Sequence, residues 1–347
     1  MSAGGSMTGA AELPSAPPAV ARGDHPIARF VLRRIAAALG TLVIISMLVF
    51  AGTEVLPGDA ASAVLGKTAT PEQVAELRAD MGLDRSIPVR YADWLSGFAR
   101  GDLGDSAAGF AAGSAMPIWN QVQPRLSATL WLAGITALLM IPLSLLLGVV
   151  AAWHAGRPAD VAISLVSLAI ISLPEFVIGS LLILALFSWL DALPPVALLD
   201  PGKSTLEQPR LLVLPVLTLL GATLAASVRM TRAGMIQALR SDFAEMARLN
   251  GFPERRVVWR HALRNALAPA VQIFAQNLQY LIGGVIVVEY LFAYPGLGKE
   301  LVDSVAIRDV RAVQSIALLI AVAVVTLNLI ADLLVLLLVP KLRTAAK

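Results

Sequence analysis

The chain has 347 residues, of which 57% are hydrophobic and 15% are charged, and its mean hydropathy is +0.75. Soluble domains contain about 45–50% apolar and about 25% charged residues, so these values indicate segments that face lipid. The chain contains no cysteine and has a net charge of +3. The missing cysteines exclude disulfides, thiolate metal sites and cysteine nucleophiles.

The N-terminal residues 1–26 are rich in alanine, glycine, proline and serine, and we expect them to form a disordered cytoplasmic leader. Residues 27–343 are expected to form one membrane domain. Its first apolar run, 35–53, is longer than the ~7–15 residues of a signal-peptide core, which argues against cleavage near Ala61-Ser62-Ala63.

Six apolar stretches are each long enough to cross a bilayer core, which takes about 20 residues in a helix. They are residues 35–53, 126–153, 161–190, 211–228, 266–288 and 312–331. Pro142, Pro174 and Pro215 fall inside them and are expected to be tolerated, because neighbouring helices can satisfy the freed carbonyls. The sequence therefore predicts an all-α integral membrane protein with six transmembrane helices.

Basic residues gather in particular loops. The loop 229–265 carries eight arginines against three acidic residues, and basic residues also precede the first span and follow the last. The loop 54–123 has five basic and nine acidic residues. Because basic loops remain in the cytoplasm, we predict cytoplasmic N and C termini, a cytoplasmic 229–265 loop and an extracytoplasmic 54–123 loop.

The extracytoplasmic loop carries its own helix signals. Thr70, Pro71 and Gln73 form a capping box at a helix start, and Gly82 can end that helix. A second helix should follow Pro88, with Tyr91, Trp94, Leu95 and Phe98 on one face that lies on the membrane surface or against span ends. We expect a packed outer cap; direct contact with cargo is the alternative.

In the cytoplasmic loop, Asp242 and Glu245 form a capping pair and Gly251 supplies a stop, which predicts a helix of about nine residues. A short capped helix with an exposed apolar face is typical of a docking site for a soluble partner. The alternative is an interfacial helix that its arginines hold on anionic lipid. The expected apolar face comprises Phe243, Met246 and Ala247.

Polar residues also occur inside the spans. In the fifth span, Gln272, Gln276, Gln279 and Gly283 share one helical face, which indicates a translocation path or an interface with a partner; hydrogen bonds within this chain are the alternative. Glu175 lies midway along the third span, where a bare carboxylate costs ~2.5–3.5 kcal/mol. We expect it to be paired, protonated or facing a cavity.

Two further acidic residues lie near span ends. Glu289 closes the fifth span, and we group it with Glu175 and the glutamines as path or interface residues; its alternative role is to cap the next loop through backbone amides. Asp332 lies one turn after Asn328 near the end of the sixth span. A bond from this pair to a neighbouring arginine is favoured over contact with cargo.

The cytoplasmic loop also resembles a known motif. Glu245-Met246-Ala247, then three residues and Gly251, is similar to the EAA motif through which permease subunits of ABC importers meet their ATPases. Together with 261–266 and 292–298, it makes residues 28–343 resemble the B-type permease subunit of the dipeptide/oligopeptide (peptide/nickel) family. Met246 replaces the first alanine of the motif and remains compatible with a helix.

This resemblance implies a type I ABC importer permease fold in the bacterial inner membrane, without catalytic activity in this chain. The implied partners are a second homologous permease, two cytoplasmic ATPases, an extracytoplasmic substrate-binding protein and lipid, with no nucleic acid. ATP and Mg would bind the ATPases, and this chain is expected to bind no cofactor and no metal. The implied ATPase contacts are Asp242, Phe243, Glu245, Met246, Ala247 and Gly251.

The resemblance favours di- and oligopeptides as cargo. Nickel, a metal chelate, glutathione or another small solute is the alternative within the same architecture. A secondary transporter driven by an ion gradient is a different class, which usually needs more spans and paired intramembrane carboxylates. Glu175 alone gives that class little support.

Overall fold

The computed structural model describes residues 26–55, 60–65, 69–80, 82–111, 116–200 and 202–338. These residues are mostly helical, and none of them forms a strand beyond one isolated bridge between Asp105 and Pro117. The expected leader lies outside the described residues, apart from Pro26, which begins the first helix. The basic C-terminal tail also lies outside them.

Four long helices are apolar enough to cross a membrane. They are α1 (Pro26–Glu54), α6 (Ile118–Trp153), α9 (Pro209–Leu239) and α14 (Val310–Leu338). Pro142 in α6 and Pro215 in α9 lie inside continuous helices, as the sequence predicted. Two bent segments complete the set, and counting each as one span gives the six spans expected.

The first bent segment joins α7 (Pro158–Ile171) to α8 (Glu175–Ile183) and a π-helical turn, Leu184–Trp189, at an angle of 105°. The sequence predicted that Pro174 would be tolerated inside this span, but the helix breaks there. Pro174 disfavours helical geometry at the residue before it, so the helix ends at Ile171. A proline is tolerated inside α6 and α9 but breaks this third segment.

The second bent segment is α12 (Leu263–Leu291), which changes direction by 46° between Leu281 and Gly283. Gly283 and Gly284 follow the bend directly. Neighbouring glycines weaken a helix locally, because they lack side chains that would pack against the preceding turn.

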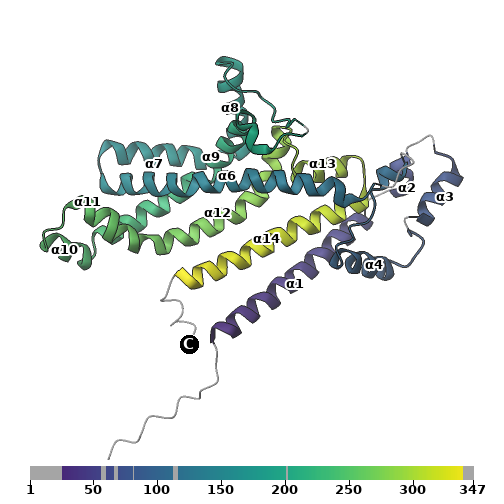
Figure 1. The fold of residues 1–347 in the computed structure, drawn as a ribbon, viewed down its shortest axis with the longest axis horizontal. Helices are drawn as coiled ribbons and strands as arrows, with labels where there is room; N and C mark the ends of the chain where they lie inside the picture. The colour runs from purple at the N-terminus through teal and green to yellow at the C-terminus, as the bar shows by residue number, and fades with distance from the viewer. Residues whose placement is uncertain are drawn as a thin grey trace, which may run out of the picture.

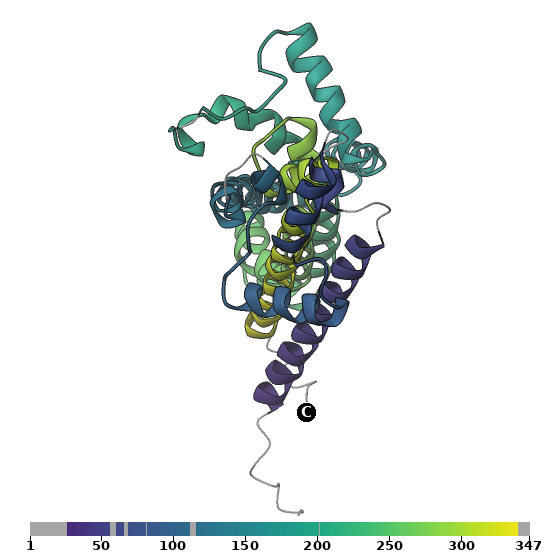
Figure 2. The same cartoon turned by 90° about the vertical axis from the view of Figure 1, so that its right-hand side faces the viewer.

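The core lies where α6, α9 and α12 meet (Figure 1). Its fully buried side chains include Leu132 and Met140 from α6, Leu219 from α9, and Leu281 from α12. Small residues allow the helices to approach: a Cβ on Gly148 of α6 would lie 2.6 Å from the Cβ of Thr231 on α9. By contrast α1 packs mainly on α14, at the periphery of the bundle (Figure 2).

One end of the molecule carries the short helices of the outer loop. They are α2 (Ala60–Leu65), α3 (Pro71–Asp80), α4 (Ile87–Ala99) and α5 (Ala107–Ala111), and α13 (Leu297–Ala306) lies near them (Figure 1). The capping box is confirmed, since the amide of Thr70 donates to Gln73 Oε1 at 2.9 Å and the amide of Gln73 donates to Thr70 Oγ1 at 3.3 Å.

The aromatic face of α4 packs against the end of the first span. The rings of Tyr91 and Trp94 lie 5.4 and 5.8 Å from the ring of Phe50 on α1. The hydroxyl of Tyr91 also shares a 2.8 Å hydrogen bond with that of Ser46. Of the two placements predicted for this helix, the contact with a span end is therefore confirmed.

The opposite end carries α10 (Asp242–Leu249) and α11 (Glu254–Arg256), followed by a π-helical turn, Val257–Ala262, that leads into α12 (Figure 1). The start of α1 and the end of α14 lie side by side, since Arg34 pairs with Asp332 at 3.2 Å. This ion pair confirms the arginine partner expected for Asp332. The start of the first span and the end of the last span therefore lie on the same side of the helical bundle.

Candidate functional site

Helix α10 forms a corner with α9. Only Arg240 and Ser241 separate them, and Ser241, not Asp242, is the N-cap residue. The Ser241 hydroxyl donates to the carbonyl of Ala238 at 2.6 Å instead of capping an amide. Asp242 and Glu245 therefore lie in the first turn, where their charges favour the helix through its dipole. The helix has eight residues, close to the nine predicted.

One face of α10 is closed against the chain. Ala244 and Ala247 are 0% and 6% exposed, and they pack on Val257 and Phe252. The prediction that Ala247 belongs to the exposed apolar face was wrong. The π-helical turn brings Val257 beneath α10, so the small side chains of the helix fit inward.

The other face of α10 is open. Phe243 is 39% exposed, Met246 is 58% exposed and Leu249 is 75% exposed. The acidic side chains of Asp242 and Glu245 are exposed beside them. Three exposed apolar side chains on an eight-residue helix with a well-defined start and end form a surface suited to a protein partner, since such patches mark interaction sites.

The helix ends in a Schellman motif. The amide of Gly251 donates to the carbonyl of Arg248 at 2.9 Å, and that of Phe252 donates to the carbonyl of Ala247 at 3.2 Å. Gly251 has φ +80°, a conformation that glycine adopts without strain. The stop predicted at Gly251 is confirmed.

An arginine braces this end of the helix. Arg248 makes two hydrogen bonds to Glu254, Nε to Oε2 at 3.0 Å and Nη2 to Oε1 at 2.9 Å, and a third to the carbonyl of Leu239 at 3.1 Å. The hydrogen bond to Arg248 lowers the pKa of Glu254 below its usual value. Arg248 thus ties α10 to the end of α9 and to α11.

The base beneath α10 is apolar and continuous with the spans. Its buried members come from the ends of α6 and α9, from the π-helical turn and from the start of α12: Val149, Ala152, Met235, Ala238, Val258, Ala262 and Ala266. Helix α10 contacts α9 and the π-helical turn, and the turn contacts α12.

The polar stripe of α12 is turned away from the core. Gln272, Gln276 and Gly283 are exposed and Gln279 is half-buried. The polar residue that packs inside is Asn277, which donates to the Thr223 carbonyl at 3.2 Å and the Ser227 hydroxyl at 2.6 Å on α9. Asn277 was not predicted from the sequence, although its place one residue after Gln276 puts it on a neighbouring face of the helix.

Glu175, at the start of α8, lies against α12. Its carboxylate accepts a hydrogen bond from the hydroxyl of Tyr280, which is 42% exposed. Glu175 itself is half-buried. Since Tyr280 follows Gln272 and Gln276 at four-residue spacing, Glu175 extends the polar stripe by one carboxylate. The partner found for Glu175 is a neutral phenol.

Glu289 is completely buried. Its carboxylate accepts hydrogen bonds from the Thr129 hydroxyl at 2.5 Å and from the amides of Gly298 and Lys299 at 2.7 and 3.2 Å. It therefore caps α13, which is the alternative role weighed for it. Thr129 extends this network, because its hydroxyl also accepts from the amide of Leu297 at 2.9 Å.

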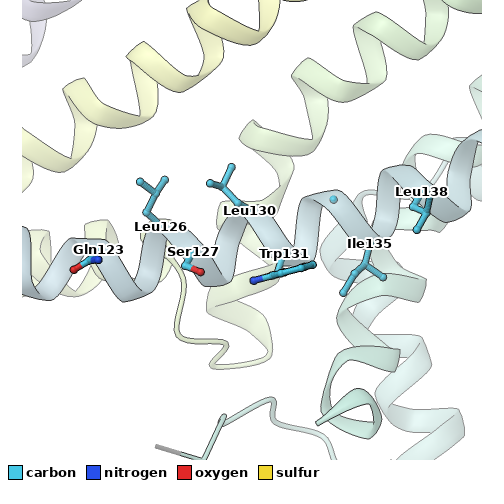
Figure 3. A pocket seen from close by; sticks show the side chains of 8 residues that line it. Gln123, Leu126, Ser127, Leu130, Trp131, Ile135 and Leu138 are labelled. Carbon is cyan, nitrogen blue, oxygen red and sulfur yellow. The ribbon is translucent and has the colours of Figure 1, made fainter. Parts of the chain in front are cut away.

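A shallow hollow of about 730 Å³ runs along the outer face of α6. Figure 3 shows Leu126 and Leu130 pointing to one side of the helix, and Trp131 and Ile135 to the other. The lining holds no titratable side chain. Within the described part of the chain, no three histidine or acidic side chains are grouped so that they could hold a metal ion.

The comparisons with known proteins match this architecture. Residues 144–344 match the family described as binding-protein-dependent transport system inner membrane component, and residues 27–133 match the N-terminal region of such components. The chain belongs to this family. It is a permease of an ABC importer, embedded in the cytoplasmic membrane through multiple apolar helices.

Curated relatives align along almost the whole permease. A probable peptide ABC transporter permease of Sinorhizobium fredii is 31% identical over 90% of this chain and 99% of its own length. A glutathione transport system permease of Pectobacterium atrosepticum is 34% identical, and the corresponding Escherichia coli protein is 33% identical; each alignment covers 88% of this chain and 95% of the relative. These names place it in the dipeptide/oligopeptide group that the sequence resembles, as a transport subunit and not an enzyme.

Proposed function

We propose that this permease pairs with a second homologous permease to form the pore, above two cytoplasmic ATPases and beneath an extracytoplasmic binding protein. The single observation that carries this proposal is α10: a capped, braced helix with Phe243, Met246 and Leu249 exposed. In this assembly ATP and Mg belong to the ATPases, and the permease supplies no catalytic group and binds no cofactor.

The composition of α10 favours an ATPase over lipid as its partner. Asp242 and Glu245 are exposed beside the apolar side chains, and anionic headgroups would repel both carboxylates. A groove in a protein can bury Met246 and Leu249 and can also offer backbone amides or basic side chains to the two carboxylates. This arrangement corresponds to helix-in-groove recognition, in which one apolar helix face inserts into a partner.

The sidedness follows from charge. Arg34 near the start of α1, the end of α14 and the arginine-rich segment around α10 lie away from the outer-loop helices. Basic segments remain in the cytoplasm, so we infer cytoplasmic N and C termini. With this orientation α10 faces the compartment that contains ATP.

The corner between α9 and α10 then acts as a lever. Closure of the ATPases on ATP would displace α10, and the two-residue connection and the Arg248 bonds would pass this movement to α9. The apolar base would pass it to α12. The spans would rock between inward-facing and outward-facing states, which is rigid-body motion of packed helices.

The exposed face of α12 supports a role in the translocation path. A membrane helix that presents Gln272 and Gln276 outward needs water or another helix on that side. Gln279 and Glu175 adjoin this surface. We place these four residues at the pore, formed jointly with the second permease. Glu289 is not included, because its carboxylate is occupied by α13.

We infer that the cargo is a di- or oligopeptide. The support comes from two relatives whose names specify a peptide and glutathione, the latter itself a small peptide. Glutathione is therefore the second candidate. The choice between them depends on the binding protein that delivers the cargo.

A cross-link tests the assignment of α10. Because the chain has no native cysteine, an introduced cysteine is its only thiol. In the intact complex, a Met246→Cys variant labelled with a maleimide-benzophenone reagent should cross-link to an ATPase on illumination, because the excited benzophenone inserts into C–H bonds of a neighbouring protein and needs no second thiol. Ile87→Cys, 56% exposed at the other end of the molecule, is the matched control and should not. Co-purification in mild detergent should recover the second permease and the ATPases. A homo-oligomer without an ATPase would refute the proposal.

A further inference from the structure

We propose that Glu175 and Tyr280 form a site in the translocation path that takes a protonated amine of the cargo. This inference rests on the proposed function, because it needs a cargo that carries an ammonium group. Three independent observations concern the place where the start of α8 meets α12: a broken span, a polar helix face and a carboxylate that accepts a hydrogen bond from a neutral hydroxyl.

The broken span indicates water. Between α7 and α8 the chain leaves helical geometry at Ser172, Leu173 and Pro174, near the middle of a segment that crosses the membrane, and all three residues are exposed. Irregular backbone at membrane depth is tolerated where it lines a water-filled cavity or is buried in protein. Glu175 is the next residue, so it lies directly at this exposed break in the span.

The polar face of α12 lies at the same place. Gln272, Gln276 and Tyr280 follow one another at four-residue spacing, and all three are exposed. Glu175 is joined to the last of them by the Tyr280 hydrogen bond. The carboxylate is thus part of a polar track along α12 and is not an isolated charge against lipid.

The charge of Glu175 is left for a ligand. Tyr280 donates a hydrogen bond but brings no charge, and no basic side chain of the described residues lies within ion-pair distance of this carboxylate. By comparison, the carboxylates of Asp160 and Asp332 in the spans are paired with Arg232 and Arg34. A carboxylate that lines the path lowers the energy of a passing cation.

The chemistry of the Glu175–Tyr280 site favours an amine over a metal ion. One carboxylate, one phenol and neighbouring glutamine amides provide hydrogen-bond acceptors for an ammonium group, which carries three donors. A transition-metal site would need several histidine or acidic ligands, and the described residues contain no such group. The site therefore fits the ammonium group of a lysine side chain in a peptide.

The test measures charge selectivity in the intact transporter. Membrane vesicles with the complete complex and its binding protein receive Ala-Lys-Ala or Ala-Glu-Ala, and initial ATP-dependent uptake rates are compared. Glu175→Gln keeps the size of the side chain and an acceptor for Tyr280. It should lower the ratio of the Lys-peptide rate to the Glu-peptide rate by about tenfold relative to the unmodified complex.

Two further variants separate charge from structure. Glu175→Asp retains the carboxylate and should keep the ratio within about twofold of that of the unmodified complex. Glu76→Gln, an exposed position on α3, controls for loss of a distant charge. Equal slowing of both peptides in Glu175→Gln would show a structural role and overturn the amine site alone. Failure of the unmodified complex to import either peptide would refute the peptide cargo together with the site.

Discussion

Arg232 on α9 holds Asp160 at the start of α7 through two hydrogen bonds, Nε to Oδ1 at 2.5 Å and Nη2 to Oδ2 at 2.8 Å. Asp160 is 3% exposed and also accepts from the amide of Gly156 at 2.9 Å. Because Arg232 lies about two turns before the α9–α10 corner, this ion pair connects the lever to the broken third span.

The first prediction concerns Asp160→Asn. This change leaves Arg232 without its countercharge, and breaking a buried pair costs about 3–5 kcal/mol. Arg232 retains 31% side-chain exposure, so we expect a loss of about 1–3 kcal/mol, measured as a lower unfolding midpoint of the purified complex. The uptake per ATP hydrolysed should also fall, because α7 no longer follows α9.

Ser164→Ala is the matched control, since it removes the weaker 3.4 Å bond to the same carboxylate and leaves the ion pair intact. It should cost less than 1 kcal/mol and leave coupling unchanged, as is typical for one peripheral hydrogen bond. If Asp160→Asn behaved like Ser164→Ala in both measurements, the pair would have no part in connecting the two elements.

The second prediction concerns Gly251→Val. A β-branched residue at φ +80° is strained, so the Schellman motif should open and the end of α10 should lose its fixed position. ATP hydrolysis should continue while ATP-dependent uptake falls at least about tenfold, a change equivalent to 1.4 kcal/mol. Uptake and hydrolysis are measured in the same vesicles at matched protein levels.

Gly251→Asn provides the control for this change, because asparagine tolerates the left-handed conformation. No atom outside the immediate neighbours lies within 4 Å of a Cβ at this position, so added bulk alone should be harmless. We expect Gly251→Asn to retain most uptake. Normal uptake by Gly251→Val would remove the rigid end of α10 from the mechanism.

Much of this permease could be predicted because its signals are local. The capping box at Thr70 and the glycine stop at Gly251 each lie within a few consecutive residues, and each of the six apolar stretches is one continuous run of sequence. Hydrophobicity and capping depend on neighbours in the sequence, so they can be recognised before the fold is known.

The remaining features depend on residues far apart in the chain. Asp160 and Arg232 are 72 positions apart, and no periodicity relates them. Ala247 faces inward because Val257 arrives beneath α10 through a π-helical turn. Pro174 breaks its span while Pro142 and Pro215 lie inside continuous helices, and the sequence alone did not distinguish the three prolines.

The third prediction compares two glycine substitutions. A Cβ on Gly296 would lie 1.9 Å from Glu289 Oε1 and 2.0 Å from its Cδ. Gly296→Ala must therefore displace a fully buried carboxylate from Thr129 and from the α13 amides. We expect a loss of about 1–3 kcal/mol, the usual range for overpacking, measured as a lower unfolding midpoint.

Gly40→Ala in α1 is its control, since nothing lies within 4 Å of a Cβ there. In a helix interior, alanine is favoured over glycine by up to about 1 kcal/mol, so this variant should be as stable as the unmodified protein or more stable. Equal effects of the two substitutions would mean that the Glu289 cap does not depend on close approach at Gly296.

The last prediction is a pH dependence at α10. The hydrogen bond from Arg248 holds the pKa of Glu254 below its usual value, so the ionised carboxylate stabilises the folded arrangement of α10 against α11. A lowered pKa gives stability that is fully present above the unfolded-state value near 4.5 and is lost as the pH falls through the folded-state value. Acid should loosen α10, and pH changes above 6 should not.

Hydrogen exchange of the amides in 243–251, corrected for the intrinsic pH effect, measures this directly. The pair is partly exposed, 39% and 45%, so its contribution is that of a surface ion pair, ~0.2–1 kcal/mol. Glu254→Gln should therefore reduce protection at pH 7 by about 1.4-fold to fivefold and abolish the acid dependence. Unchanged protection in Glu254→Gln would show that the Schellman motif holds α10 without the Arg248 brace.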